Sequence, residues 1–133
     1  GMGQSQLDDV ASEIAGRLGR VLTPDPEPEK GFYYRSDHFS FARAGIPAFY
    51  ADPGVDYLDK PPGYGIAKRE EYTANDYHAV SDEVKPDWDL SGALDDLTFM
   101  YHMGARLAAT DEWPEWSVTS EFRAIREQQR PGR

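Results

Sequence analysis

The chain contains no cysteine, has far fewer basic than acidic residues, and lacks any long apolar run. The absence of cysteine excludes disulfide bonds, thiolate zinc sites and cysteine nucleophiles together. Because 24 acidic residues stand against 14 basic ones, the net charge of −10 repels phosphate backbones and anionic lipid. No apolar run approaches the ~18 residues that a membrane span requires. We therefore expect neither a nucleic-acid partner nor a membrane partner.

The sequence does contain enough apolar material for one core. Hydrophobic residues make up 39% of its 133 residues, and this length suits one domain. We predict a single domain over residues 1–133. Residues 1–3 resemble the remnant of a cleaved tag, and no charged and apolar targeting signal follows them. They are left out of the fold expectations.

Helical periodicity predicts a first helix near the start of the chain. Apolar residues from Leu7 to Leu18 recur at helical spacing behind Ser5, and Gly19 is placed to end the helix.

A second helix is predicted over residues 90–109, with Asp89 as its N-cap. His102 lies opposite the main apolar stripe, so we expect it to be solvated or part of a contact surface and not a ligand. Phe99 and Met103 share its face. The stripe, which we predict to face the core, consists of Leu90, Ala93, Leu94, Leu97, Met100, Tyr101, Gly104, Leu107 and Ala108.

Between the two helices the sequence favours extended structure. Residues 20–22 can form a short strand, and residues 46–50, apolar apart from Pro47, are typical of a buried strand. These patterns predict an α/β fold with a partial mixed β-sheet flanked by helices. Residues 53–85 are predicted to be a long loop, either packed near a site or an ordered surface excursion. Aromatic residues of the tail are predicted packing anchors, the last of them on a short helix: Trp113, Trp116 and Phe122.

One segment, from Tyr33 to Ala48, gathers polar side chains at the start of a predicted short helix. Ser36 suits the N-cap, Asp37 suits the positive end, and Gly45 can close the helix in the left-handed conformation. A tyrosine, an aspartate and a histidine are thus brought to one edge.

A second segment places His78 in a polar loop, with Asp82 four residues later. A neutral imidazole binds metal ions, and a carboxylate nearby can fix the tautomer of the ring. Taken alone, a loop histidine is more often solvated or hydrogen-bonded than a ligand.

Together and in this order, the two segments resemble the C-terminal part of the di-zinc aminopeptidases, whose clan includes glutaminyl cyclases and glutamate carboxypeptidases. The signatures are Y-x-x-S-D-H-x-x-F-x-x-x-G-I-P-A, from Tyr33 to Ala48, and H-x-x-x-D, at His78 and Asp82. The resemblance implies the C-terminal part of a zinc-exopeptidase fold of the phosphorylase/hydrolase-like type. It also implies two zinc ions and a peptide substrate for the complete enzyme.

The resemblance implies roles for individual residues. His78 matches the last ligand of the two-zinc site, and Tyr33 matches a tyrosine that donates a hydrogen bond to the developing oxyanion, a role that the neighbouring Tyr34 could also take. The remaining matched positions would bind substrate or order the ligands: Ser36, Asp37, His38 and Asp82. We expect Tyr33, Asp37 and His78 to converge on one rim of the fold.

The chain departs from the family pattern in one large respect. A complete member carries an H-x-D pair and a Glu-Glu pair upstream of these motifs, whereas this chain has no H-x-D and its Glu70-Glu71 pair follows the S-D-H motif. We therefore predict a C-terminal fragment of a larger metallopeptidase domain that is inactive alone and binds zinc weakly or not at all. Exposed apolar surface would favour a homo-oligomer. By resemblance, the parent enzyme would be periplasmic or secreted.

Two alternatives remain open. A glutaminyl cyclase shares the fold, although that class typically has an acid in place of Ser36. A non-catalytic interaction module that keeps the fold would also account for the missing ligands. The acidic net charge of −10 favours a substrate with a free ammonium group, as in an aminopeptidase.

Overall fold

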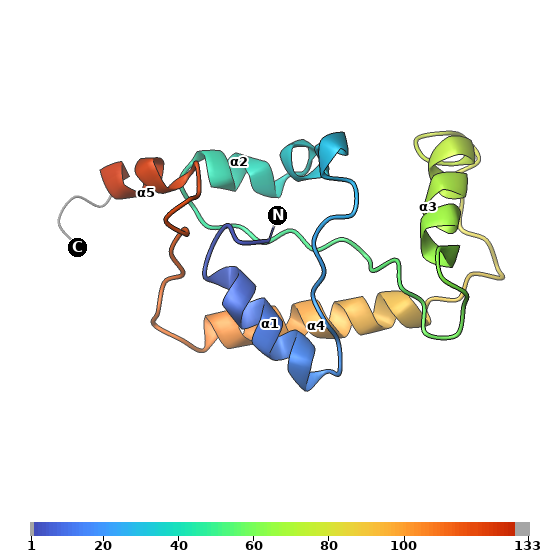
Figure 1. The fold of residues 1–133 in the computed structure, drawn as a ribbon, viewed down its shortest axis with the longest axis horizontal. Coiled ribbons are helices and arrows are strands. Elements are labelled where there is room, and N and C mark those ends of the chain that lie inside the picture. The colour runs from blue at the N-terminus through green and yellow to red at the C-terminus, as the bar shows by residue number, and fades with distance from the viewer. Residues whose placement is uncertain (1, 130–133) are drawn as a thin grey trace. The chain divides into compact units, whose positions relative to one another are not determined.

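The computed structural model describes residues 2–129, and this range is helical (Figure 1). The chain divides into two compact units, residues 1–51 with 97–133 (unit 1) and residues 52–96 (unit 2). The single domain over residues 1–133 stays a prediction. No helix within residues 2–129 combines the length and the apolar character needed to cross a bilayer. The helices are α1 (Leu7–Arg17), η1 (Pro28–Lys30), η2 (Phe32–Arg35), α2 (His38–Arg43), α3 (Tyr64–Asn75), α4 (Ser91–Ala108) and α5 (Arg123–Gln129).

The predicted mixed β-sheet, and with it the α/β fold class, is wrong. Residues 2–129 contain no β-strand, and their β-type pairing is an isolated bridge between Ser5 and Trp116. Residues 20–22 and 46–50, the two predicted strands, have no regular secondary structure. An apolar run predicts burial of side chains, but a strand also needs a neighbour that exchanges backbone hydrogen bonds with it. Pro47 moreover lacks the N–H that a ladder uses.

The first predicted helix is confirmed as α1, and local contacts account for both of its ends. Leu7 donates its N–H to Oγ of Ser5, and the N–H of Ser5 donates to Oδ2 of Asp8, so side chains accept from two backbone N–H groups at the start of the helix. Gly19 has a φ of +70°, and the N–H of Arg20 returns to the carbonyl of Ala15. This left-handed turn ends the helix.

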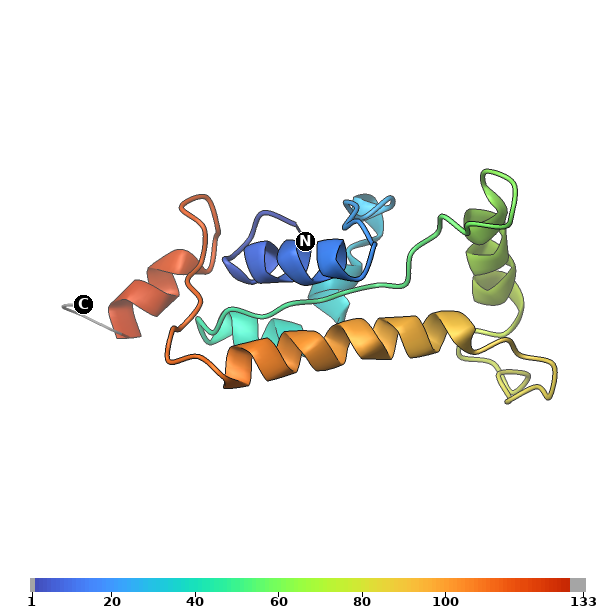
Figure 2. The same cartoon turned by 90° about the horizontal axis from the view of Figure 1, so that it is seen from below.

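The core of unit 1 begins where α1 packs against α4. Ala11, Ile14 and Ala15 of α1 are buried against Phe99 and Met103 of α4, and α1 crosses α4 in Figure 1 and lies next to it in Figure 2. The extended segment 46–50 adds an aromatic contact to this core, with ring centroids 6.2 Å apart between Phe49 and Phe99.

The predicted helix over residues 90–109 is confirmed as α4, but its predicted core face is wrong. Phe99 and Met103, which the sequence placed on the opposite face, are the buried residues of the helix. Leu94 and Leu97 of the predicted core stripe are 65% and 67% exposed. Helix α4 is apolar on more than one side, so periodicity alone does not decide which side α1 covers.

A second cluster in unit 1 joins α2 to the C-terminal segment. Trp116 and Phe122, two of the predicted tail anchors, are buried with Ala42, whereas Trp113 is 62% exposed. Nε1 of Trp116 donates to the carbonyl oxygen of Gly45 at 3.0 Å. The predicted anchoring is thus confirmed for Trp116 and Phe122 and wrong for Trp113.

Unit 2 contains helix α3 inside the segment that was predicted to be a long loop. Gly65 is the one buried residue that the structure describes between residues 52 and 96. A Cβ atom at Gly65 would lie 2.2 Å from the carbonyl oxygen of Val55, so the close approach there requires glycine. Polar contacts on the surface link other segments of this unit, and one example is the ion pair between Arg69 of α3 and Asp52.

Candidate functional site

The two motifs of the predicted site lie in different units. Tyr33 belongs to η2, and Asp37 and His38 begin α2, all in unit 1. His78 and Asp82 follow α3 in unit 2. The convergence of the two motifs on one rim stays a prediction.

In unit 1, two aromatic rings pack against His38. The ring of Tyr33 meets the imidazole edge to face with centroids 4.5 Å apart, and the ring of Tyr50 stacks on it at 4.8 Å with an interplanar angle of 21°. Nδ1 and Nε2 of His38 and the hydroxyl oxygen of Tyr33 are buried without a hydrogen-bond partner among residues 2–129. Buried polar atoms normally have a partner, so this cluster has unused capacity to donate and accept hydrogen bonds.

Burial sets the protonation of this cluster. It raises the pKa of Tyr33 to about 12, with further contributions from Tyr34, Glu121 and Asp8. Burial also lowers the pKa of His38 from its usual 6.5. At neutral pH Tyr33 therefore keeps its proton and is a hydrogen-bond donor, while the neutral imidazole of His38 has one donor and one acceptor nitrogen.

The structure distinguishes the two neighbouring tyrosines of the motif. The hydroxyl of Tyr34 donates to Oε1 of Glu121 at 3.0 Å, and Tyr34 is 53% exposed. This hydrogen bond raises the pKa of Tyr34. Because its hydroxyl already has an acceptor, Tyr34 is a weaker candidate than Tyr33 for contact with a developing oxyanion.

Ser36 and Asp37 contribute backbone atoms to the start of α2. The carbonyl of Ser36 accepts from the N–H of Phe39, and the carbonyl of Asp37 accepts from the N–H of Ser40. The carboxylate of Asp37 is exposed and makes no capping hydrogen bond. Their predicted role in binding substrate or ordering ligands stays a prediction.

In unit 2, His78 is exposed and lies at the tip of a turn. Its φ of 59° is the one positive value among the described residues that are not glycine. Histidine adopts this left-handed conformation more readily than most residues, but still at a cost. The imidazole stacks on the ring of Tyr77 with centroids 3.9 Å apart.

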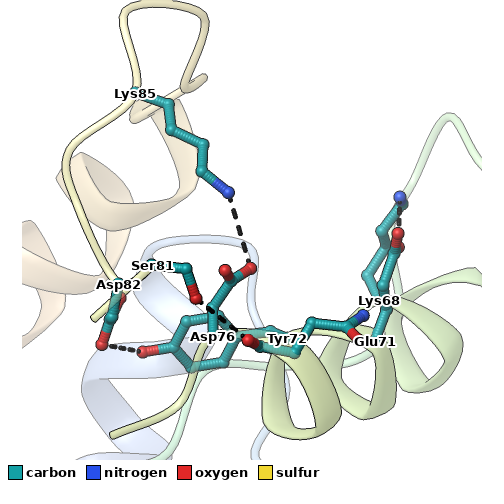
Figure 3. A network of polar contacts seen from close by, with 8 residues as sticks. Lys68, Glu71, Tyr72, Asp76, Ser81, Asp82 and Lys85 are labelled. Carbon is teal, nitrogen blue, oxygen red and sulfur yellow. Dashed lines mark hydrogen bonds and ion pairs between the residues drawn. The ribbon is translucent and has the colours of Figure 1, made fainter. Parts of the chain in front are cut away.

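Side-chain contacts link the segment that follows the His78 turn to α3 and its C-terminal end (Figure 3). The hydroxyl of Tyr72 donates to Oδ2 of Asp82 at 2.9 Å. Oγ of Ser81 donates to the carbonyl of Asn75 at 3.0 Å. Nζ of Lys85 lies 3.5 Å from Oδ2 of Asp76. Asp82 thus steadies the turn through Tyr72.

Sequence reasoning assigned neither Tyr50 nor Tyr72 to the site. Tyr50 directly follows an apolar run, and Tyr72 precedes Asp82 by ten residues, so nothing in their spacing marks a contact with His38 or Asp82. Such contacts depend on how the chain folds back on itself, which local patterns do not encode.

The described residues do not fit a zinc ion by themselves. A catalytic zinc takes about three protein ligands, and no group of three or more His, Cys, Asp or Glu within residues 2–129 is placed to hold a metal ion. His78 offers an exposed imidazole, whereas an oxygen of Asp82 already accepts from Tyr72. Any zinc at His78 would need ligands from other residues.

Unit 1 also contains an apolar cavity of about 630 Å³ that none of the predicted site residues lines. Phe49, Met103 and Trp113 are among its walls, with Arg126 at one side. The cavity is therefore separate from the aromatic cluster around His38.

Comparison with known protein families shows to which family the chain belongs. The sequence model of one family, peptidase family M28, matches residues 1–102. The chain belongs to peptidase family M28. The matched range includes both the S-D-H segment and the H-x-x-x-D segment of this M28 chain, so it confirms the resemblance inferred from them. No curated protein and no solved structure matches the chain.

Proposed function

We propose that the chain is the C-terminal part of a zinc-dependent aminopeptidase that hydrolyses N-terminal residues from peptides. The observation that carries this proposal is the occurrence of both motifs, in order, inside the M28 match over residues 1–102. A family match gives the class of hydrolase, and the aminopeptidase specificity is our inference from the motifs.

Tyr33 is our candidate for stabilising the oxyanion. Its hydroxyl is buried, protonated at neutral pH and without a partner among residues 2–129. Donors that are already in place and shielded from water stabilise a developing negative charge most effectively. These properties support the role, and the ring of His38 beside it holds Tyr33 in position.

His78 is our candidate metal ligand. Its imidazole is exposed on a turn whose C-terminal end contacts Tyr72 and Asn75 of α3. The backbone of His78 is in the left-handed region, and such outliers concentrate at functional sites. A fixed turn with a strained, exposed histidine supports a ligand role.

The remaining ligands and the general base of the peptidase would come from an H-x-D pair and a Glu-Glu pair upstream of the S-D-H segment, where this chain has neither. Because residues 2–129 form no group of three metal-binding side chains, we propose that the isolated chain is inactive. The same observation favours the second candidate, a non-catalytic interaction module of the same family.

The coding sequence upstream of this chain discriminates between the two candidates. An in-frame H-x-D pair followed by a Glu-Glu pair supports the aminopeptidase, and a longer reading frame without them supports the interaction module. A signal peptide at the start of that frame would support our further expectation that the parent enzyme is exported. The serine at position 36 weighs against a glutaminyl cyclase, because that class typically has an acid there.

A further inference from the structure

Helix α4 has a solvent-exposed apolar stripe on the side that α1 does not cover. Its spacing alternates between four and three residues, which is the a and d pattern of a coiled coil. Phe99 and Met103, which contact α1, lie outside the stripe on the opposite side of the helix. All members of the stripe are exposed, and the first of them directly precedes α4: Leu90, Leu94, Leu97, Tyr101, Gly104 and Ala108.

We infer that this stripe pairs with the same stripe of a second copy, with the two α4 helices antiparallel. A two-fold axis near Phe99 aligns a and d positions across the pair, as antiparallel coiled coils require. Leu97 then faces Tyr101 of the second copy, and Leu94 faces Gly104. Leu90 faces Ala108 at both ends of the interface.

Side-chain size supports the antiparallel register. The large residues Leu90 and Leu94 are at one end of the stripe, and the small residues Gly104 and Ala108 are at the other. Antiparallel pairing places large against small in each outer layer, which conserves the packed volume. A Cβ placed on Gly104 meets nothing within 4 Å, so the leucine of a second copy has room there. Parallel pairing would leave a void between two Gly104 residues.

Charge does not oppose the antiparallel register, and the helix dipoles favour it. The positions that flank the stripe on both sides carry no charged residue: Ser91, Ala93, Thr98, Met100, Ala105 and Leu107. The acidic residues Asp95 and Asp96 are near the N-terminal end of α4, and Arg106 is near the C-terminal end. These three residues lie outside the a, d, e and g positions, so they do not decide the register, whereas the antiparallel arrangement is favourable for the two helix dipoles.

Sedimentation of the whole chain at 1 to 200 µM tests the pairing, with the concentration range chosen to span roughly micromolar affinities. We expect a reversible dimer. Leu97→Lys should raise the dissociation constant roughly 100-fold, because a charge enters both central layers. Val118→Lys is the matched control, since Val118 is 81% exposed outside the helix, and it should leave the dimer unchanged. Circular dichroism verifies that both variants keep their helices.

The natural absence of cysteine allows a test of orientation. A mixture of Leu94→Cys and Gly104→Cys chains should form the mixed disulfide in preference to either homodisulfide. A monomer over the whole concentration range, equal effects of Leu97→Lys and Val118→Lys, or a preference for homodisulfides would overturn the inference. The interface includes neither Tyr33 nor His78, so these outcomes leave the proposed peptidase function untouched.

Discussion

At the scale of single residues, the described structure is most unusual around Tyr33 and His38. Both side chains bury polar atoms without a partner among residues 2–129, although Tyr50 and Tyr33 pack against the imidazole from two sides. The S-D-H signature indicated that these residues belong to a site. It could not indicate the partner Tyr50, because that contact arises only when the segment after α2 folds back.

The burial of His38 makes stability dependent on pH. Because burial lowers its pKa below 6.5, the unfolded chain binds a proton more readily than the folded chain. The stabilising contribution is complete above about pH 6.5 and is lost as the pH falls through the lowered pKa. Urea unfolding at pH 7.5 and 5.5 should show a smaller pH-dependent loss for His38→Phe than for the natural chain.

His102→Phe is the control for this comparison, since His102 is exposed on α4. That variant should keep the pH dependence of the natural chain. If His38→Phe lost as much unfolding free energy between the two pH values as the natural chain, the imidazole of His38 would have the same pKa in the folded and unfolded states.

At the scale of elements, local signals predicted α1 and α4, missed α3, and predicted two strands that residues 2–129 do not form. The contacts of Ser5 with Asp8 and the left-handed Gly19 are within a few residues of α1, and Asp89 accepts a hydrogen bond from the N–H of Ser91 at the start of α4. Sequence patterns encode such contacts directly. A strand at residues 46–50 would depend on partners distant in sequence, and the buried side of α4 depends on where α1 docks.

Gly45 should be required at the end of α2 for two reasons that can be separated. Its φ is +77°, and an added Cβ would lie 3.0 Å from the backbone nitrogen of Arg126 in the C-terminal segment. Gly19 has a φ of +70° but open space around it. We predict that Gly19→Ala costs about 1 kcal/mol of unfolding free energy, for backbone conformation alone. Gly45→Ala should cost clearly more, and equal losses in urea unfolding would contradict the contact with Arg126.

The buried side of α4 can be tested by truncation. Met103 is 4% exposed and Leu97 is 67% exposed. Met103→Ala should lower the unfolding free energy by about 2–5 kcal/mol, because it leaves a cavity in the core. Leu97→Ala should change it by less than about 0.5 kcal/mol when measured on dilute, monomeric protein. The reverse order of effects would restore the stripe predicted from the sequence as the core face.

At the scale of the whole molecule, the two units differ in how they are stabilised. Unit 1 contains both clusters of buried apolar side chains. Of the described residues in unit 2, Gly65 alone is buried, and a glycine contributes no side chain to a core. Opening of unit 2 should therefore cost much less free energy than opening of unit 1.

Hydrogen exchange followed by mass spectrometry tests this difference. We predict that backbone amides of α3 exchange well before those of α1, although the two helices have 12 and 11 residues. The polar contacts of Figure 3, all on the surface of unit 2, give little protection. Equal protection of α3 and α1 would mean that unit 2 shares the stability of the core.

Our central claim is that this M28 chain, matched to the family over residues 1–102, is inactive in isolation. Turnover of an aminoacyl-nitroanilide with added zinc measures this, with His78→Ala and His102→Ala as paired variants. We predict no hydrolysis by any of the three proteins, because residues 2–129 bring no three metal-binding side chains together. Hydrolysis that persists in His102→Ala and disappears in His78→Ala would show that this chain forms a complete zinc site, contrary to our proposal.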